Sequence, residues 1–292
     1  MFIRDMLQIG EGFTQGERLV ADYFLSKGNA IANQSTRHIA DALYLSAPSV
    51  VRLCQKLGFA GFNEFKRSYL DELAYVEQHF QGVDANEPFE ERDDIMRVAS
   101  KLSALHRETA EDTMSILNRD DLAYATRLLL RAYDIVVCAV GPQYHLACIF
   151  QSWMASIGYS VHVSHSMNDT FMRACYADET TCFMFISYSG ESELTLRVAQ
   201  KVAERGLPAF AITSLGSNSL SRLISHTLHV TTREHLRGTV APFASTESMM
   251  LLLNVLYACA FNAHHAQRFG QRQLYAKEFE PKRISDNPIL VD

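Results

Sequence analysis

The sequence predicts two structural parts: an all-helical N-terminal domain, and an α/β domain in which helices flank a parallel sheet. Two observations support this fold class. Apolar residues recur at helical spacing through residues 1–77. After residue 133, short apolar runs rich in β-branched residues alternate with helical stretches. This alternation is typical of a parallel sheet that is covered on both faces.

The composition narrows the class of protein. A net charge of −6 over 292 residues argues against a chain that coats nucleic acid along its length. Basic residues are nevertheless concentrated between Ser35 and Ser68, where five stand against two acidic residues. The six cysteines form no C-x-x-C pair, so we expect no metal site and no cofactor. Because the sequence contains neither a membrane-length apolar run nor a secretory signal pattern, we expect a cytoplasmic protein with no membrane contact.

The N-terminal part is expected to contain four helices. Thr14 and Glu17 have the spacing of a capping box, in which each side chain pairs with the backbone N–H of the other residue. The next helices are expected to begin at Ser35 or Thr36, to run from Ser46 to Gly58, and to cover 62–76. Beyond an acidic, aperiodic linker over 78–93, two more helices are expected over 95–117 and 121–131.

The C-terminal part is expected to alternate strands with helices. The strands are expected over 134–140, 160–163, 181–187, 207–213 and 226–230, with helices ending near 157 and covering 191–204 and 246–261. The resulting domain boundaries are 1–77 for the helical domain, 78–121 for the linker and connecting helices, 122–265 for the α/β domain, and 266–292 for a C-terminal extension.

Residues 36–55 have the pattern of a helix-turn-helix unit. Ala40 is the small residue that lets the first helix pack closely on the second, and Tyr44 stands in the turn where glycine is common, which predicts a slightly wider turn. The second helix would present short hydroxyls first and longer cations after, an order that suits phosphates and base edges in the DNA major groove. A helical bundle with an exposed basic face explains this pattern equally well. The expected DNA-binding residues are Arg37, Ser46, Ala47, Ser49, Arg52, Lys56 and Lys66.

The stretch "SYSGES" follows the apolar strand that ends near Ile186 and precedes a predicted helix. The N-terminus of a helix exposes unpaired backbone N–H groups and the positive end of the helix dipole. Gly190 allows a ligand to approach the backbone closely, and Ser187, Ser189 and Ser192 add neutral donors. The sequence therefore predicts an anion pocket at the end of this strand, with a serine-rich turn that only caps the helix as the simpler alternative.

Two segments resemble a known family. The stretch "VRLCQKLGFAGFNEFKRSYL" (51–70) resembles the N-terminal domain of the RpiR family of bacterial transcriptional regulators, and this resemblance covers about residues 1–77. The stretch "SYSGES" resembles the S-x-S-G-E-[ST] loop of sugar isomerase (SIS) domains, which bind phosphosugars and form the C-terminal domain of RpiR regulators. The resemblance implies a flavodoxin-like three-layer SIS domain, an operator DNA, a phosphosugar effector, and a homodimer or homotetramer.

One part of the SIS pattern is altered. The first strand of SIS domains usually ends in Gly-x-Gly-x-Ser, whereas this chain has Gly141, Pro142 and Gln143 there, and Pro142 removes a backbone donor. The residues expected to bind the phosphosugar are Ser187, Ser189, Gly190, Glu191, Ser192, Gly141, Gln143 and Glu247.

Three functions are compatible with this pattern. The first is a DNA-binding regulator of sugar or amino-sugar metabolism whose SIS domain senses a phosphosugar without catalysis. The second is a phosphosugar isomerase, for which Glu191, Glu247, His145, His162 or His165 could serve as the base. The third is a DNA-binding protein whose SIS domain is only a dimerisation scaffold. We expect the first, with no catalytic residues.

Overall fold

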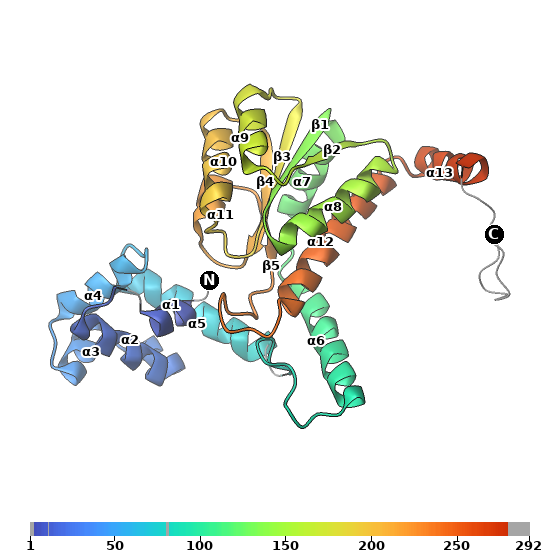
Figure 1. Ribbon diagram of the computed structural model, residues 1–292. Helices are drawn as coiled ribbons and strands as arrows, with labels where there is room; N and C mark the ends of the chain where they lie inside the picture. The colour runs from blue at the N-terminus through green and yellow to red at the C-terminus, as the bar shows by residue number, and fades with distance from the viewer. Residues whose placement is uncertain (1–2, 11, 80–81, 280–292) are drawn as a thin grey trace. The chain divides into compact units, whose positions relative to one another are not determined.

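The computed structural model describes residues 3–10, 12–79 and 82–279. The chain divides into two compact units (Figure 1). The first unit is built from residues 1–116, 214–218 and 229–248, and the second from 117–213, 219–228 and 249–292.

The first unit begins with a helical domain. Its elements are α1 (Ile3–Ile9), α2 (Gln15–Lys27), the 3-10 helix η1 (Gly28–Asn33), α3 (Thr36–Leu43), α4 (Ala47–Lys56) and α5 (Phe62–His79). The predicted capping box at the start of α2 is confirmed, because Thr14 and Glu17 each accept a hydrogen bond from the other's backbone N–H. The core is aromatic: the ring of Phe65 lies 4.7 Å from that of Phe24 and 5.6 Å from that of Tyr69. The contact between Phe24 of α2 and Phe65 of α5 holds the two helices together.

Helices α3 and α4 form the predicted helix-turn-helix pair. Ala40, buried in α3, accepts a hydrogen bond at its carbonyl from Leu45 N at 2.9 Å, which closes the end of the helix. Tyr44 takes the left-handed conformation itself, with φ 56° and ψ 37°. The prediction of a wider turn was therefore wrong: the turn has the tight form that glycine usually supplies.

The predicted linker contains no helix or strand over residues 82–94, but it is packed within the first unit. Ala85 is buried with Leu105 of α6 (Ile95–Ser115) and Ala244. Asn86 accepts hydrogen bonds at its side-chain oxygen from His235 N (2.7 Å) and at its carbonyl from Val240 N (3.0 Å). This part of the chain is thus fastened to the 231–243 loop instead of acting as a free tether.

The C-terminal part carries the predicted five-stranded sheet. Its strands are β1 (Asp134–Ala139), β2 (Ser160–Val163), β3 (Thr181–Ser187), β4 (Ala209–Ser214) and β5 (Thr227–Val230), in the order β2-β1-β3-β4-β5. β1 pairs in parallel with β2 and with β3, and β3 pairs in parallel with β4. The chain leaves β1 toward one edge and returns to form β3 on the other side of β1. Such a reversal opens a crevice at the carboxyl ends of the two strands, where ligands bind in open α/β sheets.

Helices cover both faces of this sheet (Figure 1). Helices α9 (Met167–Tyr176), α10 (Glu193–Glu204) and α11 (Ser219–Leu223) pack on the alternating residues Val136, Cys138, Phe183, Phe185 and Ala211. On the other side lie α8 (Pro142–Ala155) and α12 (Phe243–Asn262). The remaining helices are α7 (Arg119–Arg131), which spans the predicted boundary at 121/122, and α13 (His265–Phe279). The predicted α/β class with helices on both faces is confirmed.

Within the described part of the chain, α12 alone has the length and hydropathy of a membrane span. Its most apolar window has a mean hydropathy of 1.3, and 44% of that window is buried inside the protein. A core helix of a folded domain meets the same two criteria, and α12 contributes Leu252, Leu253 and Leu256 to the buried core.

Candidate functional site

The predicted recognition helix α4 carries a connected polar row. The hydroxyls of Ser46 and Ser49 share a hydrogen bond of 2.9 Å, and Arg52 Nη2 donates to Ser49 Oγ at 2.9 Å. This serine–arginine row (Ser46, Ser49 and Arg52) orients the exposed guanidinium along α4 before any ligand is bound. Ser46 is the N-cap residue, yet its side chain caps no N–H of the helix. The N-terminus of α4 is therefore available to a phosphate oxygen.

The two lysines that were predicted to contact DNA make hydrogen bonds inside the helical domain. Lys56 Nζ pairs with Glu17 Oε2 at 2.9 Å and donates to the carbonyl of Gly12. Lys66 Nζ donates to the carbonyls of Ala32 (3.0 Å) and Gln34 (3.3 Å). Both ammonium groups join distant segments of the fold. The ion pair with Glu17 leads us to expect a structural role for Lys56 instead of the DNA contact that the sequence suggested. Contact with DNA stays a prediction for Lys66, for Arg37, which is exposed, and for Ala47, which is half-buried.

Sequence reasoning missed a hollow beside this helix pair. It has a volume of about 650 Å³ and lies between the start of α3 and the start of α5. Its lining includes Ser35, Thr36, Lys66 and Arg67. No residue spacing signals it, because it forms only when the two helix starts are brought together.

Replacing Lys56 with glutamine is expected to lower the thermal midpoint and to leave the salt dependence of DNA binding unchanged. The hydrogen bond from Thr14 N and the neighbouring Lys56 hold the pKa of Glu17 below its ordinary value. Stabilisation of this kind is present above the ordinary carboxyl pKa and is lost as the pH falls through the folded pKa. The difference in midpoint between parent and variant should therefore shrink in acid. A reduced salt slope in the variant would show instead that Lys56 contacts a phosphate.

The predicted anion loop leaves β3 at the carboxyl edge of the sheet. Gly190 has φ +65°, a left-handed conformation that turns the chain from the strand toward α10. Gly190 N donates to the buried Ser187 Oγ at 3.3 Å, and Glu191 N donates to Ser189 Oγ at 3.1 Å. Thr213 Oγ1 on the neighbouring strand β4 donates to the carbonyl of Tyr188 at 3.3 Å. These bonds give the loop a defined shape before a ligand binds.

The N-terminus of α10 has no side-chain cap. Ser192 occupies the N-cap position, but its hydroxyl makes no hydrogen bond to the first turn of the helix. By contrast, α9 begins at Ser166, whose side chain accepts from Asp169 N at 3.3 Å. Helix α10 thus presents first-turn N–H groups and a serine hydroxyl for which the described residues supply no capping bond. This arrangement can accept the oxygens of an anion.

The end of β1 contributes a second uncapped helix start. Gly141 has φ +60° and makes no side-chain cap, and Pro142 occupies the first turn of α8. A proline at this position costs the helix no hydrogen bond, since the N–H that it lacks would have no partner within the helix. Gln143 is half-buried in the same turn, and the ring of Tyr144 stacks on His165 at 3.6 Å. Gly141 and Gln143 lie at the start of α8, the helix that follows β1. Strand β1 pairs with β3, the strand that leads into the anion loop.

The two glutamates weighed as bases have structural partners. The sequence placed Glu191 in the first turn of the helix, but it lies two residues before α10. Its Oε1 accepts from Ser219 N at 2.8 Å, at the start of α11. Glu247 belongs to the first unit, where its Oε2 lies 3.5 Å from His106 Nδ1. His162 pairs with Asp134 at 3.0 Å, and Asp134 is the first residue of β1, at the opposite edge of the sheet from the loop.

Three cysteines of the described residues are buried. Burial raises the pKa of Cys54, Cys138 and Cys182 to about 12, so these thiols stay protonated. Within 3–10, 12–79 and 82–279, no three His, Cys, Asp or Glu side chains gather as metal ligands would.

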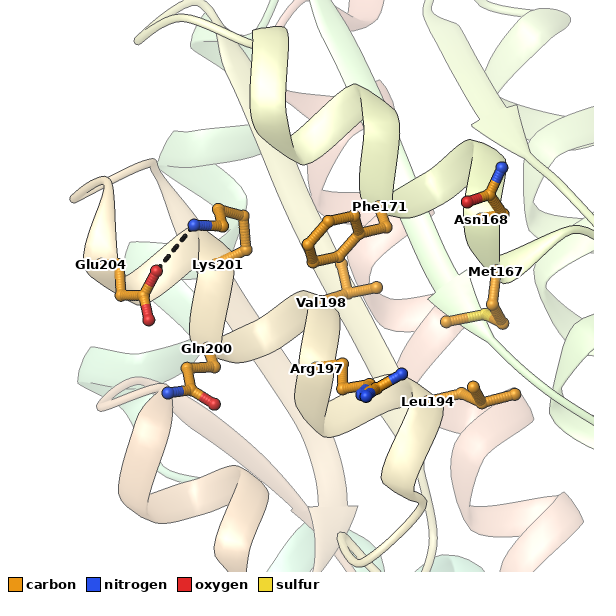
Figure 2. Close-up of a pocket in the computed structure, with 9 residues that line it drawn as sticks. All are labelled: Met167, Asn168, Phe171, Leu194, Arg197, Val198, Gln200, Lys201 and Glu204. Atoms are coloured by element: carbon orange, nitrogen blue, oxygen red, sulfur yellow. Dashed lines mark hydrogen bonds and ion pairs between the residues drawn. The ribbon is translucent and has the colours of Figure 1, made fainter.

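The second unit also has a groove beside α10. Figure 2 shows it between α9 and α10, with a volume of about 600 Å³. Met167, Phe171 and Val198 line its apolar part, and the ion pair of Lys201 and Glu204, 2.8 Å long, lies at one end. None of the residues predicted to bind the phosphosugar lines it.

Comparison with known proteins assigns both parts of the chain. The profile of the "Helix-turn-helix domain, rpiR family" matches residues 3–75, and the profile of the "SIS domain" matches residues 128–259. The chain belongs to the RpiR family. An uncharacterized HTH-type transcriptional regulator of Caldanaerobacter subterraneus is 23% identical over 250 residues, which is 86% of each chain. The uncharacterized HTH-type transcriptional regulator YfhH of Escherichia coli K12 is also 23% identical, over 96% of this chain and 95% of its own.

A solved structure has a similar fold over nearly the whole chain. The NanR protein of Vibrio vulnificus, solved in complex with ManNAc-6P, superposes with a TM-score of 0.62 at 20% identity, over 97% of this chain and 99% of its own. This similarity shows the fold. As an RpiR-family protein, the chain is a DNA-binding transcriptional regulator that pairs a helix-turn-helix domain with a SIS domain.

Proposed function

We propose that the SIS domain binds a phosphosugar effector at the Ser187–Ser192 loop and thereby alters operator binding by the helix-turn-helix domain. The observation that carries this proposal is the start of α10, where Ser192 occupies the N-cap position without capping the helix. A phosphate would supply the acceptors that the first-turn N–H groups and the Ser192 hydroxyl lack within the fold. NanR, which shares the fold, was solved with a sugar phosphate.

The β1–α8 turn is proposed to hold the sugar beside the phosphate. Gly141 leaves the backbone open there, and the Gln143 amide can both donate to and accept from sugar hydroxyls. Glu191 supports the loop through Ser219 N. A ligand contact of Glu247 stays a prediction from the sequence. The residues proposed here are those that the sequence predicted. Only the role of Glu191 differs, because it now supports the loop in place of binding the ligand directly.

The site is proposed to sense its ligand without converting it. An isomerase needs a carboxylate or imidazole free to take a proton from the sugar. The Glu191 carboxylate accepts from Ser219 N, and the buried thiols are protonated. The protein is proposed to act in the cytoplasm. It is also proposed to form a homodimer or homotetramer, because a helix-turn-helix domain reads paired half-sites.

A thermal-shift screen tests the effector site. Fructose 6-phosphate, glucosamine 6-phosphate, ribose 5-phosphate and ManNAc-6P are compared with inorganic phosphate and with the unphosphorylated sugars. At least one phosphosugar is expected to raise the midpoint, because a ligand at about 100 times its Kd stabilises the native state by roughly 2.7 kcal/mol. The same sugar is expected to be recovered without isomerisation. Turnover that disappears in Glu191→Gln would identify an enzyme, and no shift with any phosphosugar would favour the scaffold alternative.

A further inference from the structure

Tyr44 combines an unfavourable backbone conformation with a side chain that the fold does not use. It is the one non-glycine residue among the described positions with a positive φ, at 56°, whereas ten described glycines share that sign. The left-handed region is costly for a residue with a Cβ atom, and glycine would occupy this position without that cost. The Tyr44 side chain is 97% exposed, and no ring contact or hydrogen bond of it is found among the described residues.

Tyr44 stands in the turn between α3 and the predicted recognition helix α4. It is the C-cap residue of α3 and stands two residues before Ser46, the N-cap residue of α4. It is thus the exposed side chain of the turn that leads into the helix carrying the serine–arginine row. Strain at a residue whose side chain makes no ring contact or hydrogen bond among the described residues points to a use outside the fold.

We propose that Tyr44 is a DNA-binding residue whose phenolic hydroxyl donates a hydrogen bond to a phosphate oxygen of the operator. This rests on the DNA-binding function of the chain and not on the effector site. Tyrosine is among the side chains that contact phosphates, and a phosphate oxygen can only accept. Tyr44 precedes the recognition helix, so it lies beside the groove-reading side chains of α4 and not among them. As a neutral donor it positions α4 on the duplex without displacing counterions.

Tyr44→Phe tests the hydroxyl. The probe is a duplex selected by the parent protein from a random-sequence library, with a scrambled duplex of the same composition beside it. Tyr44→Phe is expected to weaken binding to both by a similar factor, roughly tenfold for a hydrogen bond to a charged group. The slope of log affinity against log salt should equal that of the parent. Tyr176→Phe makes the same small change at an exposed tyrosine in the other unit, at the end of α9. This variant should bind both duplexes as the parent does.

Tyr44→Gly separates DNA contact from folding. Glycine relieves the left-handed strain and removes no internal contact, so the thermal midpoint is expected to rise or to stay the same while affinity falls as in Tyr44→Phe. A loss of affinity without a loss of stability cannot come from unfolding. Parent-like affinity of Tyr44→Phe, or a lower thermal midpoint of Tyr44→Gly, would overturn the assignment. Arg52→Ala in the same assay reports whether α4 binds DNA at all, so failure of the DNA-binding assignment is distinguished from failure of Tyr44.

Discussion

Arg52→Ala is expected to weaken binding to the selected operator duplex by about 1–3 kcal/mol, a factor of roughly 5 to 150 in Kd. The guanidinium is exposed on α4 and is oriented by Ser49, so little side-chain freedom is lost when it meets a base edge. Truncation removes a bidentate donor that suits guanine. The measurement is affinity for the selected duplex and for single-base variants of it. Discrimination at one position of each half-site should relax.

Two variants control for charge and for folding in this experiment. Arg97→Ala removes an exposed arginine of α6, where Arg97 pairs with Asp93 at 3.0 Å, and should leave DNA binding unchanged. Lys56→Gln removes a cation of α4 itself that is committed to Glu17. If Arg52→Ala bound as tightly as Arg97→Ala, α4 would not be the recognition helix.

Ser192→Ala is expected to abolish the response of operator binding to the phosphosugar. The lost bond is a hydrogen bond to a charged group, worth about 1.5–3 kcal/mol, so effector affinity should fall by roughly one to two orders of magnitude. Without effector, the thermal midpoint and the operator affinity should match the parent, because the Ser192 hydroxyl caps nothing in the helix. Operator affinity is measured with and without effector at one fixed salt concentration.

Ser166→Ala is the matched control for Ser192→Ala. It makes the same substitution at the N-cap position of α9, where the hydroxyl does accept from Asp169 N. Removal of a working cap costs about 1 kcal/mol, so this variant should be less stable than the parent and should respond to the effector normally. A normal effector response in Ser192→Ala would place the effector elsewhere, and the groove between α9 and α10 would then be the next site to test.

Local sequence signals determined most of the secondary structure. The Thr14–Glu17 capping box and the strands that lead into Gly141 and Ser187 could be read directly, because their periods and end residues act over a few positions. Helix α9 was missed: its ten residues connect two strands and carry a short apolar pattern. The turn at Tyr44 was misjudged, since propensity favours glycine there and tertiary packing of α3 on α4 overrides it.

The sequence by itself determined the family, the order of the two domains, and the residue types of both proposed sites. Only the tertiary structure decided which of those side chains remain available. Lys56 and Lys66 carry the charge that DNA attracts, yet the fold engages them with Glu17, Gly12, Ala32 and Gln34. Ser166 and Ser192 are both N-cap serines, and only one of them caps. A residue type shows what a side chain can bind, whereas its availability depends on partners distant in the chain, which local spacing does not encode.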